Sequence, residues 1–226
     1  MGIKLLALTD IHGKISSLTG ILGSVLPSHK IDLITISGDI SHFGDGAEVE
    51  RILGHVDQTG IPYCYILGNC DPPDKKGGVN ARGKCVQDAC ASFDGINVAG
   101  SGGSMPTPFG TPFEVAEDEI VGNLLRNISR CPSLPPLGAL MLISHNPPFG
   151  GTFDRTSFGQ HVGSRMLKDL ILEISPALVQ CGHIHEGAGV ERMGKSLVFN
   201  PGPAMKGRYA IAEIGGGVPN VKLGTA

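Results

Sequence analysis

The stretch YCYILGNCDPP, residues 63–73, says most about the fold. Its first five residues are apolar and typical of a buried strand, and the turn begins at Gly68. Asn69, Cys70 and Asp71 then place three polar or reactive side chains at the tip of that strand, before two prolines that disfavour a regular helix start. A buried strand that ends in such side chains is typical of an open parallel sheet with a ligand site beyond its carboxyl ends.

The same order of elements occurs twice before this stretch. Apolar runs of strand type occupy residues 3–8 and 33–37, and each is followed by a helical pattern, at residues 14–26 and 46–58. Asp45 with Glu48 three residues later matches a capping box before the second helix. The first 70 residues therefore predict a β-α-β-α-β unit, a parallel sheet with right-handed crossovers.

Beyond residue 84 the pattern continues with mixed elements. Strands are predicted at residues 96–99, 139–144 and 178–180, helices at 117–127 and 164–174, and a short helix near 85–92. From residue 190 onward, short alternating runs predict antiparallel strands and hairpins. No repeat or linker divides the chain, so we expect one domain over residues 1–226 of the α/β class.

Composition excludes several classes of protein. The net charge of −3 and the absence of Trp argue against a nucleic-acid partner held by phosphate neutralisation or base stacking. No stretch approaches the roughly 18 apolar residues of a membrane span, so no membrane partner is expected. The six cysteines form no CxxC pair, and we expect reduced thiols and a cytoplasmic location.

Five predicted strands end in residues that can bind a metal ion, within LALTDIHG, ITISGDI, YILGNCD, MLISHNPP and LVQCGHIH. The candidate ligands are Asp10, His12, Asp39, Asn69, His145, His183 and His185. Taken singly, an aspartate after a strand is usually a turn former, and a lone histidine is usually a satisfied polar residue. Together, at the carboxyl ends of neighbouring strands, they predict a metal site.

The donor types limit the metal. Imidazoles with carboxylates suit Mn, Fe, Zn, Ni or Co, and we expect Mn to serve in vitro. Seven ligands are too many for one tetrahedral ion, but they suit two ions that share a bridging carboxylate. Such pairs lie about 3.5–4 Å apart and bind both oxygens of an in-line displacement at phosphorus.

The ordered motifs DxH, GD, GN, H and GHxH resemble those of the calcineurin-like metallophosphoesterases, over residues 10–202. The segments SHNPPFGGTFD, QHVGS, CGHIHEGAG and FNPGP look closest to the Icc-related branch of predicted phosphoesterases. The resemblance implies a four-layer α/β/β/α sandwich and two divalent ions, with hydrolysis of a small phosphate ester by a hydroxide that bridges them. It assigns the first ion to Asp10, His12, Asp39 and His185, and the second to Asp39, Asn69, His145 and His183, with Asp39 bridging.

Cys70 departs from the family pattern, which often has GNH at this point, the His acting as general acid or phosphate ligand. A neutral thiol is a weak donor, so Cys70 marks the absence of that acid. Positioned acids contribute about 10²- to 10⁴-fold, most where the leaving group is poor. We therefore expect phosphodiesters to be favoured over alkyl monoesters. A nucleophile, a disulfide partner or a metal ligand are the less favoured interpretations of Cys70.

Three further features are left open. Asp71 either orients the site water or Asn69, or is a turn former before Pro72. His161 is a candidate to reach the phosphate. The loop at residues 74–84, which carries Lys75, Lys76, Arg82 and Lys84, either binds a second phosphate or is a solvated basic run. Alternatives to a phosphodiesterase are a phosphomonoesterase or nucleotidase, and a non-catalytic metal-binding scaffold of the same fold.

Overall fold

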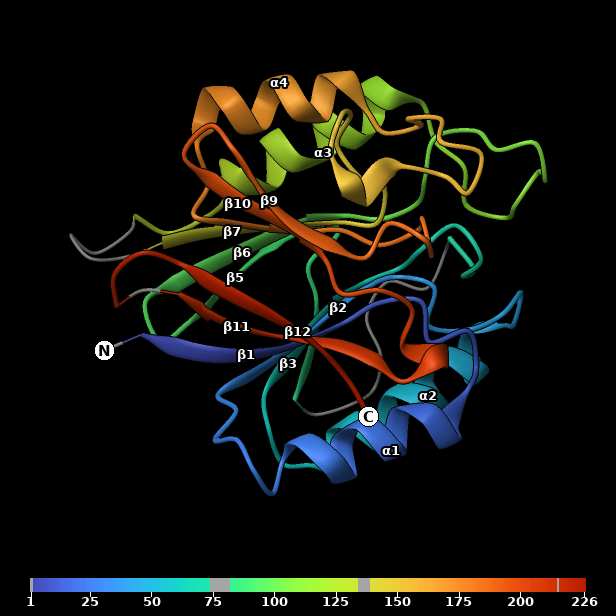
Figure 1. Cartoon of the computed structure of the whole chain (residues 1–226), viewed down its shortest axis with the longest axis vertical. Coiled ribbons are helices and arrows are strands. Elements are labelled where there is room, and N and C mark those ends of the chain that lie inside the picture. The colour runs from blue at the N-terminus through green and yellow to red at the C-terminus, as the bar shows by residue number, and fades with distance from the viewer. Residues whose placement is uncertain (1, 74–81, 134–138, 215) are drawn as a thin grey trace.

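A computed structural model describes residues 2–73, 82–133, 139–214 and 216–226. Two six-stranded sheets lie face to face in the middle of the molecule, and a pair of helices covers the outer face of each (Figure 1). The architecture is therefore the predicted four-layer α/β/β/α sandwich. The basic run at residues 75–84 falls mainly outside the described residues.

The first sheet carries the predicted parallel unit. Its strands run in the order β12 (Asn220–Thr225), β11 (Arg208–Ile214), β1 (Ile3–Leu8), β2 (Leu33–Ser37), β3 (Tyr63–Ile66) and β4 (Gly83–Cys85). Strands β1 to β4 are mutually parallel, whereas β11 and β12 are antiparallel to their neighbours. Helices α1 (Ile15–Val25) and α2 (Gly46–Asp57) cover its outer face (Figure 1).

The second sheet is also mixed. Its order is β5 (Cys90–Phe93), β6 (Ile96–Ser101), β7 (Ala139–Ser144), β8 (Leu178–Gln180), β10 (Ser196–Asn200) and β9 (Gly189–Met193). Its outer face packs against α3 (Glu117–Ile128) and α4 (Arg165–Ile174). Short 3₁₀ turns, η1 (Thr152–Asp154) and η2 (Ala204–Lys206), lie in the connections.

Three layers of apolar side chains hold the four layers of backbone together. Within β1, Leu6 and Leu8 join the cluster under α1 and α2, while Leu5 and Ala7 join the cluster between the sheets. The strand is thus buried on both faces, which explains its unbroken apolar run. No helix among the described residues is long and apolar enough to cross a bilayer.

The predicted helix near residues 85–92 is wrong. This segment forms the ends of β4 and β5, and β5 pairs antiparallel with β6 across Asp94 and Gly95. Both turn residues have positive φ, 44° and 87°, as a two-residue type I′ hairpin requires. The Asp-Gly pair between two short apolar runs was the signal for this hairpin. Pairing at the sheet edges overrides the weak helical pattern.

The expectation that all six cysteines are reduced thiols is also wrong. Cys90 of β5 and Cys131, just after α3, form a disulfide across a sequence separation of 41 residues. The fold brings these residues together, and nothing in their spacing predicts it. A cytoplasmic location stays a prediction, and this disulfide is the feature that counts against it, since disulfides are rare in reducing compartments.

Removing the disulfide is expected to lower the free energy of unfolding by about 2–4 kcal/mol, because a closed loop of this length restricts the unfolded chain. Denaturant unfolding of the Cys90→Ser/Cys131→Ser double variant against the oxidised protein measures the difference. Wild-type protein under reductant is the control and should unfold with the variant. Equal midpoints for all three samples would contradict a disulfide in the folded protein.

Candidate metal centre

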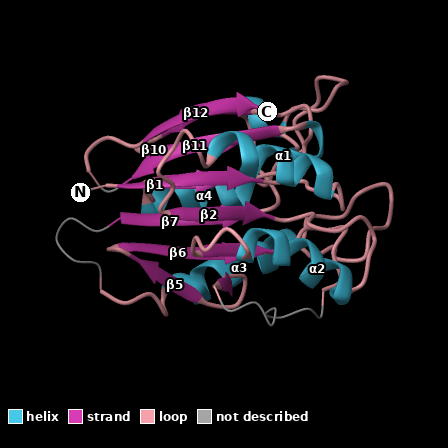
Figure 2. Ribbon diagram, turned by 90° about the horizontal axis from the view of Figure 1, so that it is seen from below, coloured by secondary structure: helices cyan, strands magenta, loops and turns pink. Residues whose placement is uncertain are grey.

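The seven candidate ligands all follow strands whose carboxyl ends meet on one side of the molecule. Loops gather beyond the arrowheads of β1 and β2 on that side (Figure 2). The segments after β1, β2 and β3 come from the first sheet, and those after β7 and β8 come from the second. The site therefore lies where the ends of both sheets face each other.

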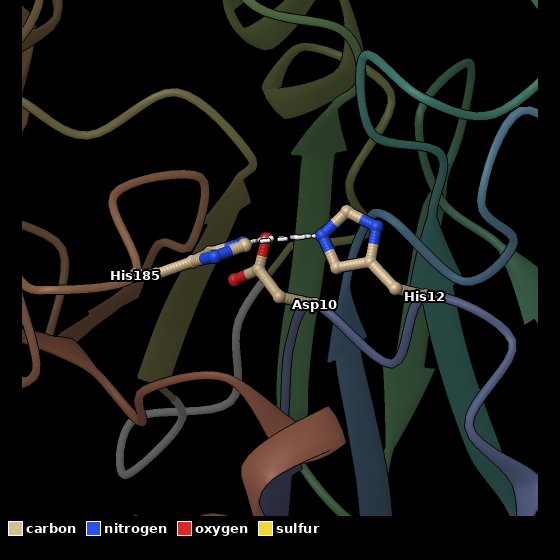
Figure 3. Close-up of side chains that lie close together, drawn as sticks. All are labelled: Asp10, His12 and His185. Carbon is tan, nitrogen blue, oxygen red and sulfur yellow. Dashed lines mark hydrogen bonds and ion pairs between the residues drawn. The ribbon is translucent and has the colours of Figure 1, made fainter.

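Asp10, His12 and His185 form one cluster of donors. The His185 Nε2 atom lies 3.4 Å from Asp10 Oδ1, and His12 Nε2 lies 3.9 Å from the same oxygen. The two imidazoles approach from either side of the carboxylate, with 3.1 Å between their Nε2 atoms (Figure 3). One ligand atom from each residue lies within 4.8 Å of the others, a spacing that suits a single ion.

Asn69, His145 and His183 form a second cluster. The Asn69 Oδ1 atom lies 2.9 Å from His145 Nε2 and 2.7 Å from His183 Nδ1. Asn69 is held in this orientation because its amide nitrogen donates to Thr111 Oγ1 at 3.1 Å, and Thr111 Oγ1 donates to Glu114. Thr111 is a positioning residue that the sequence did not indicate, since it lies 42 residues from Asn69.

Asp39 lies between the two clusters. Its Oδ1 atom is 3.4 Å from His145 Nε2, and its Oδ2 atom is 3.5 Å from His12 Nε2. Each carboxylate oxygen therefore faces a different cluster. This is the arrangement that a carboxylate shared by two ions requires.

The buried carboxylate of Asp10 tests whether the donors suit a metal. Asp10 is fully buried, and neither of its oxygens has a hydrogen-bond partner among the described residues. A buried carboxylate without donors is costly unless a cation compensates it. The donors present, imidazole nitrogens with carboxylate and amide oxygens, match first-row divalent ions.

The backbone is strained at this site. Asp10, His12, Asp39 and His183 have φ of 52°, 45°, 49° and 67°, in the left-handed region that non-glycine residues rarely adopt. Each such residue costs on the order of 1–3 kcal/mol, and such residues cluster at functional sites. Four of the seven candidate ligands carry this strain, which aims their side chains into the gap between the sheets.

The ionisable side chains of the site shift one another's pKa values. Burial alone would lower the pKa of His145, but the Asp39 charge and hydrogen bond outweigh it and raise the pKa to about 9. Burial would raise the pKa of Asp39, but the charge of His145 holds it well below its usual range. Burial, with His145 nearby, lowers the pKa of His183 to about 4. His145 is therefore held as the charged partner of Asp39, whereas His183 is held neutral.

Cys70 lies at the edge of the same site. One atom each from Cys70, His12 and Asp39 lie within 4.8 Å of one another, and Cys70 Sγ is 3.6 Å from Asn69 Nδ2. Burial, and then the charge of Asp39, raises the pKa of the thiol well above its usual range. Cys70 is thus held as a neutral thiol, which disfavours a thiolate nucleophile.

Asp71 bonds to the backbone rather than to Asn69. Its carboxylate accepts from the amides of Ile40, Ser41 and Gly68 at 3.0, 2.7 and 2.9 Å, and from Ser41 Oγ at 2.8 Å. It therefore ties the turn after β3 to the turn after β2. Burial, with Asp39 nearby, raises the pKa of Asp71 to about 6. These contacts make Asp71 a positioning residue for Asp39 and Asn69.

The remaining candidates lie outside the two clusters. His161 hydrogen-bonds to Asp154 on the loop before α4, and no hydrogen bond or ion pair among the described residues joins it to the seven ligands. Of the basic run, Arg82 pairs with Asp57 of α2, and Lys84 lies over the ring of Phe93. Both side chains therefore have partners away from the clusters.

Two buried carboxylates among imidazoles, at the ends of two facing sheets, are the features of a hydrolytic metalloprotein. The chain belongs to the calcineurin-like phosphoesterase family, whose model matches residues 3–187. The resemblance in the strand-end motifs is thus confirmed. The general activity of this family is the hydrolysis of phosphate esters, which depends on divalent metal ions.

Relatives cover most of the chain. An uncharacterised protein of Methanocaldococcus jannaschii is 31% identical over 89% of this chain and 88% of its own length. A probable cyclic nucleotide phosphodiesterase of Synechococcus is 22% identical over 82% of this chain and 74% of its own. The crystal structure of TT1561 of Thermus thermophilus covers 100% of this chain and 99% of its own, with a TM-score of 0.74 at 19% identity, and shows the fold alone.

Proposed function

We propose that this protein is a dinuclear metal-dependent phosphoesterase that favours phosphodiesters. The position of Asp39 carries the proposal, because each of its two oxygens faces a separate cluster of histidines, at 3.4 and 3.5 Å. The buried carboxylate of Asp10 supports it, because it has no hydrogen-bond donor among the described residues and faces the imidazoles of His185 and His12.

The seven residues divide between two ions in this proposal. Asp10, His12, Asp39 and His185 would hold the first ion, and Asp39, Asn69, His145 and His183 the second. Mn, Fe, Zn, Ni or Co all suit these donors, and Mn is the metal for a first assay. Bound ions of this kind activate water and neutralise charge on a phosphoryl group. The protein's own part is to hold the donors together at the strand ends, with Asp39 and Asn69 fixed by Asp71 and Thr111.

Cys70 is the basis for preferring diesters. A thiol that stays neutral is a poor proton donor to an ester oxygen, and burial with the nearby Asp39 charge keeps it neutral by raising its pKa. Substrates with less basic leaving groups need less help from an acid. The similarity to a probable cyclic nucleotide phosphodiesterase is in keeping with this preference. The substrate is thus proposed to be a small phosphodiester.

The proposal is tested by a paired rate measurement. Purified protein with Mn²⁺ is given bis(p-nitrophenyl) phosphate and p-nitrophenyl phosphate in parallel, and the diester is expected to react faster. A faster monoester would instead favour a phosphomonoesterase or nucleotidase. No turnover of either, with metal bound, would favour a non-catalytic scaffold.

Changing Cys70 to His is expected to raise turnover of alkyl phosphate monoesters by about 10²-fold, the lower end of what a positioned acid contributes. The imidazole would sit beside Asp39 and supply the proton that a poor leaving oxygen needs. Release of inorganic phosphate from an alkyl monoester measures the effect. Cys70→Ser is the control and should not gain activity. An unchanged rate in Cys70→His would remove Cys70 as the cause of the diester preference.

A further inference from the structure

Asp154 and His161 form a second polar pair, outside the metal ligands. Asp154 is fully buried, and its carboxylate accepts four hydrogen bonds. Three come from the backbone amides of Gly150, Gly151 and Gly163, at 2.9, 3.0 and 3.1 Å. The fourth comes from His161 Nδ1 at 2.8 Å. The three amides therefore hold the Asp154 carboxylate in one orientation, and the carboxylate orients the His161 imidazole.

The imidazole of His161 is oriented but not enclosed. Its Nδ1 is held by Asp154, its ring lies 5.6 Å from the ring of Phe149, and its backbone pairs with Arg155. The side chain nevertheless keeps 39% of its surface exposed, unlike that of Asp154. Within the described residues, only Nδ1 of the two ring nitrogens is hydrogen-bonded. Nε2 therefore stays available to a ligand.

The loop that carries the pair, residues 149–163, packs on the segments that carry metal ligands. The Ser164 amide, just after the loop, donates to Pro147 O at 2.9 Å, two residues after His145, and the Phe149 amide donates to Ser164 O at 2.9 Å. On the other side, Gly187, two residues after His185, lies so close that an added Cβ would be 2.4 Å from Phe153 O. The loop, in yellow and orange before α4, lies among those at the strand-end side (Figure 1).

An orienting aspartate behind one nitrogen of a histidine is an arrangement that serves proton transfer at the other nitrogen. A buried Asp with an exposed His also occurs as a purely structural pair. Here, however, the pair lies on a loop that packs between the segment after His145 and the segment after His185. Position 70, where a donor would be expected, offers only a thiol.

We propose that His161, oriented by Asp154, donates a proton to the leaving oxygen of the phosphodiester. This inference rests on the proposed function and deepens it: Cys70 supplies no acid beside Asp39, and His161 would supply one from the loop before α4 for diesters with basic leaving groups. Water forms the new P–O bond and gives up one proton to solvent, while the bond to the leaving oxygen breaks. The proton on Nε2 of the imidazolium passes to that oxygen and leaves the neutral ring with Nδ1–H on Asp154. Solvent then restores the Nε2 proton.

The test is the dependence of rate on the leaving group. Methyl aryl phosphate diesters with p-nitrophenol and with the more basic phenol as leaving groups are compared in wild type and His161→Gln, both loaded with Mn²⁺. The variant is expected to lose about 10²-fold with phenol and little with p-nitrophenol, since only the basic oxygen needs a proton. His29→Gln, an exposed histidine after α1, is the matched control and should match wild type with both.

The pattern of rates distinguishes a proton donor from a binding residue and from a structural pair. Equal loss with both leaving groups would make His161 a binding residue and overturn the proton donor. No loss with either would leave the pair a structural feature of the loop. If wild type hydrolyses neither diester although it binds Mn²⁺, the proposed function fails and the donor role fails with it. Activity of wild type therefore separates the two claims.

Discussion

Replacing Asp39 by Asn is expected to abolish phosphodiester hydrolysis. Asp39 is the ligand that we propose to be shared by two ions, with an oxygen 3.4 Å from His145 and another 3.5 Å from His12. An amide carries no charge and has a single acceptor oxygen, so it cannot bridge two cations. The loss should exceed about 10²-fold, the effect of removing a single transition-state contact in other enzymes.

The fold should survive this change. The amide side chain has nearly the same size as the carboxylate it replaces, and its oxygen can still accept the 2.8 Å hydrogen bond from the Cys70 amide. Turnover of bis(p-nitrophenyl) phosphate measures activity, and thermal unfolding in chelator compares the two folds. A variant that folds like wild type and keeps most of its activity would exclude Asp39 as a bridging ligand.

Replacing Gly68 by Ala is expected to damage both stability and metal binding. A Cβ at this position would lie 2.1 Å from Asp39 Oδ1 and 2.2 Å from Asp39 N, far inside any real contact. The backbone of Asp39 cannot yield as a flexible side chain would. Overpacking costs about 1–3 kcal/mol and sometimes more, and here the displaced group is the proposed bridging carboxylate.

The matched control for Gly68→Ala is Gly54→Ala within α2. An added Cβ at Gly54 meets nothing within 4 Å, so the change should be neutral or stabilising by up to about 1 kcal/mol. Urea unfolding and the Mn²⁺ content of dialysed protein are measured for both variants. If Gly68→Ala retained wild-type stability and metal content, the close approach of the turns after β2 and β3 would be wrong.

Much of the fold could be predicted because its strands carry local signals. Residues 3–8, 33–37 and 139–144 are largely apolar, as strands covered on both faces must be. The N-terminal cap of α2 could also be predicted from local sequence. Asp45 accepts a hydrogen bond from the Glu48 amide, as the spacing of these two residues indicated. The ligand cluster followed from the same signals, because parallel strands bring their carboxyl ends to one edge.

What could not be predicted depends on contacts distant in sequence. The Cys90–Cys131 disulfide spans 41 residues and joins an edge strand to the end of a helix. The hydrogen bond from His161 to Asp154 is close in sequence, but the spacing did not indicate it, because the loop that also brings three backbone amides to the carboxylate has no regular pattern. Whether Asp71 faces Asn69 or the backbone was likewise decided by the packing of two turns rather than by residue type.

A metal titration of activity tests the central claim most directly. Protein stripped with chelator receives increasing Mn²⁺ while turnover of bis(p-nitrophenyl) phosphate is followed. Two ions sharing Asp39 predict that turnover rises from background and reaches its plateau at two ions per chain. A plateau at one ion per chain, or full turnover in the metal-free protein, would contradict a dinuclear centre.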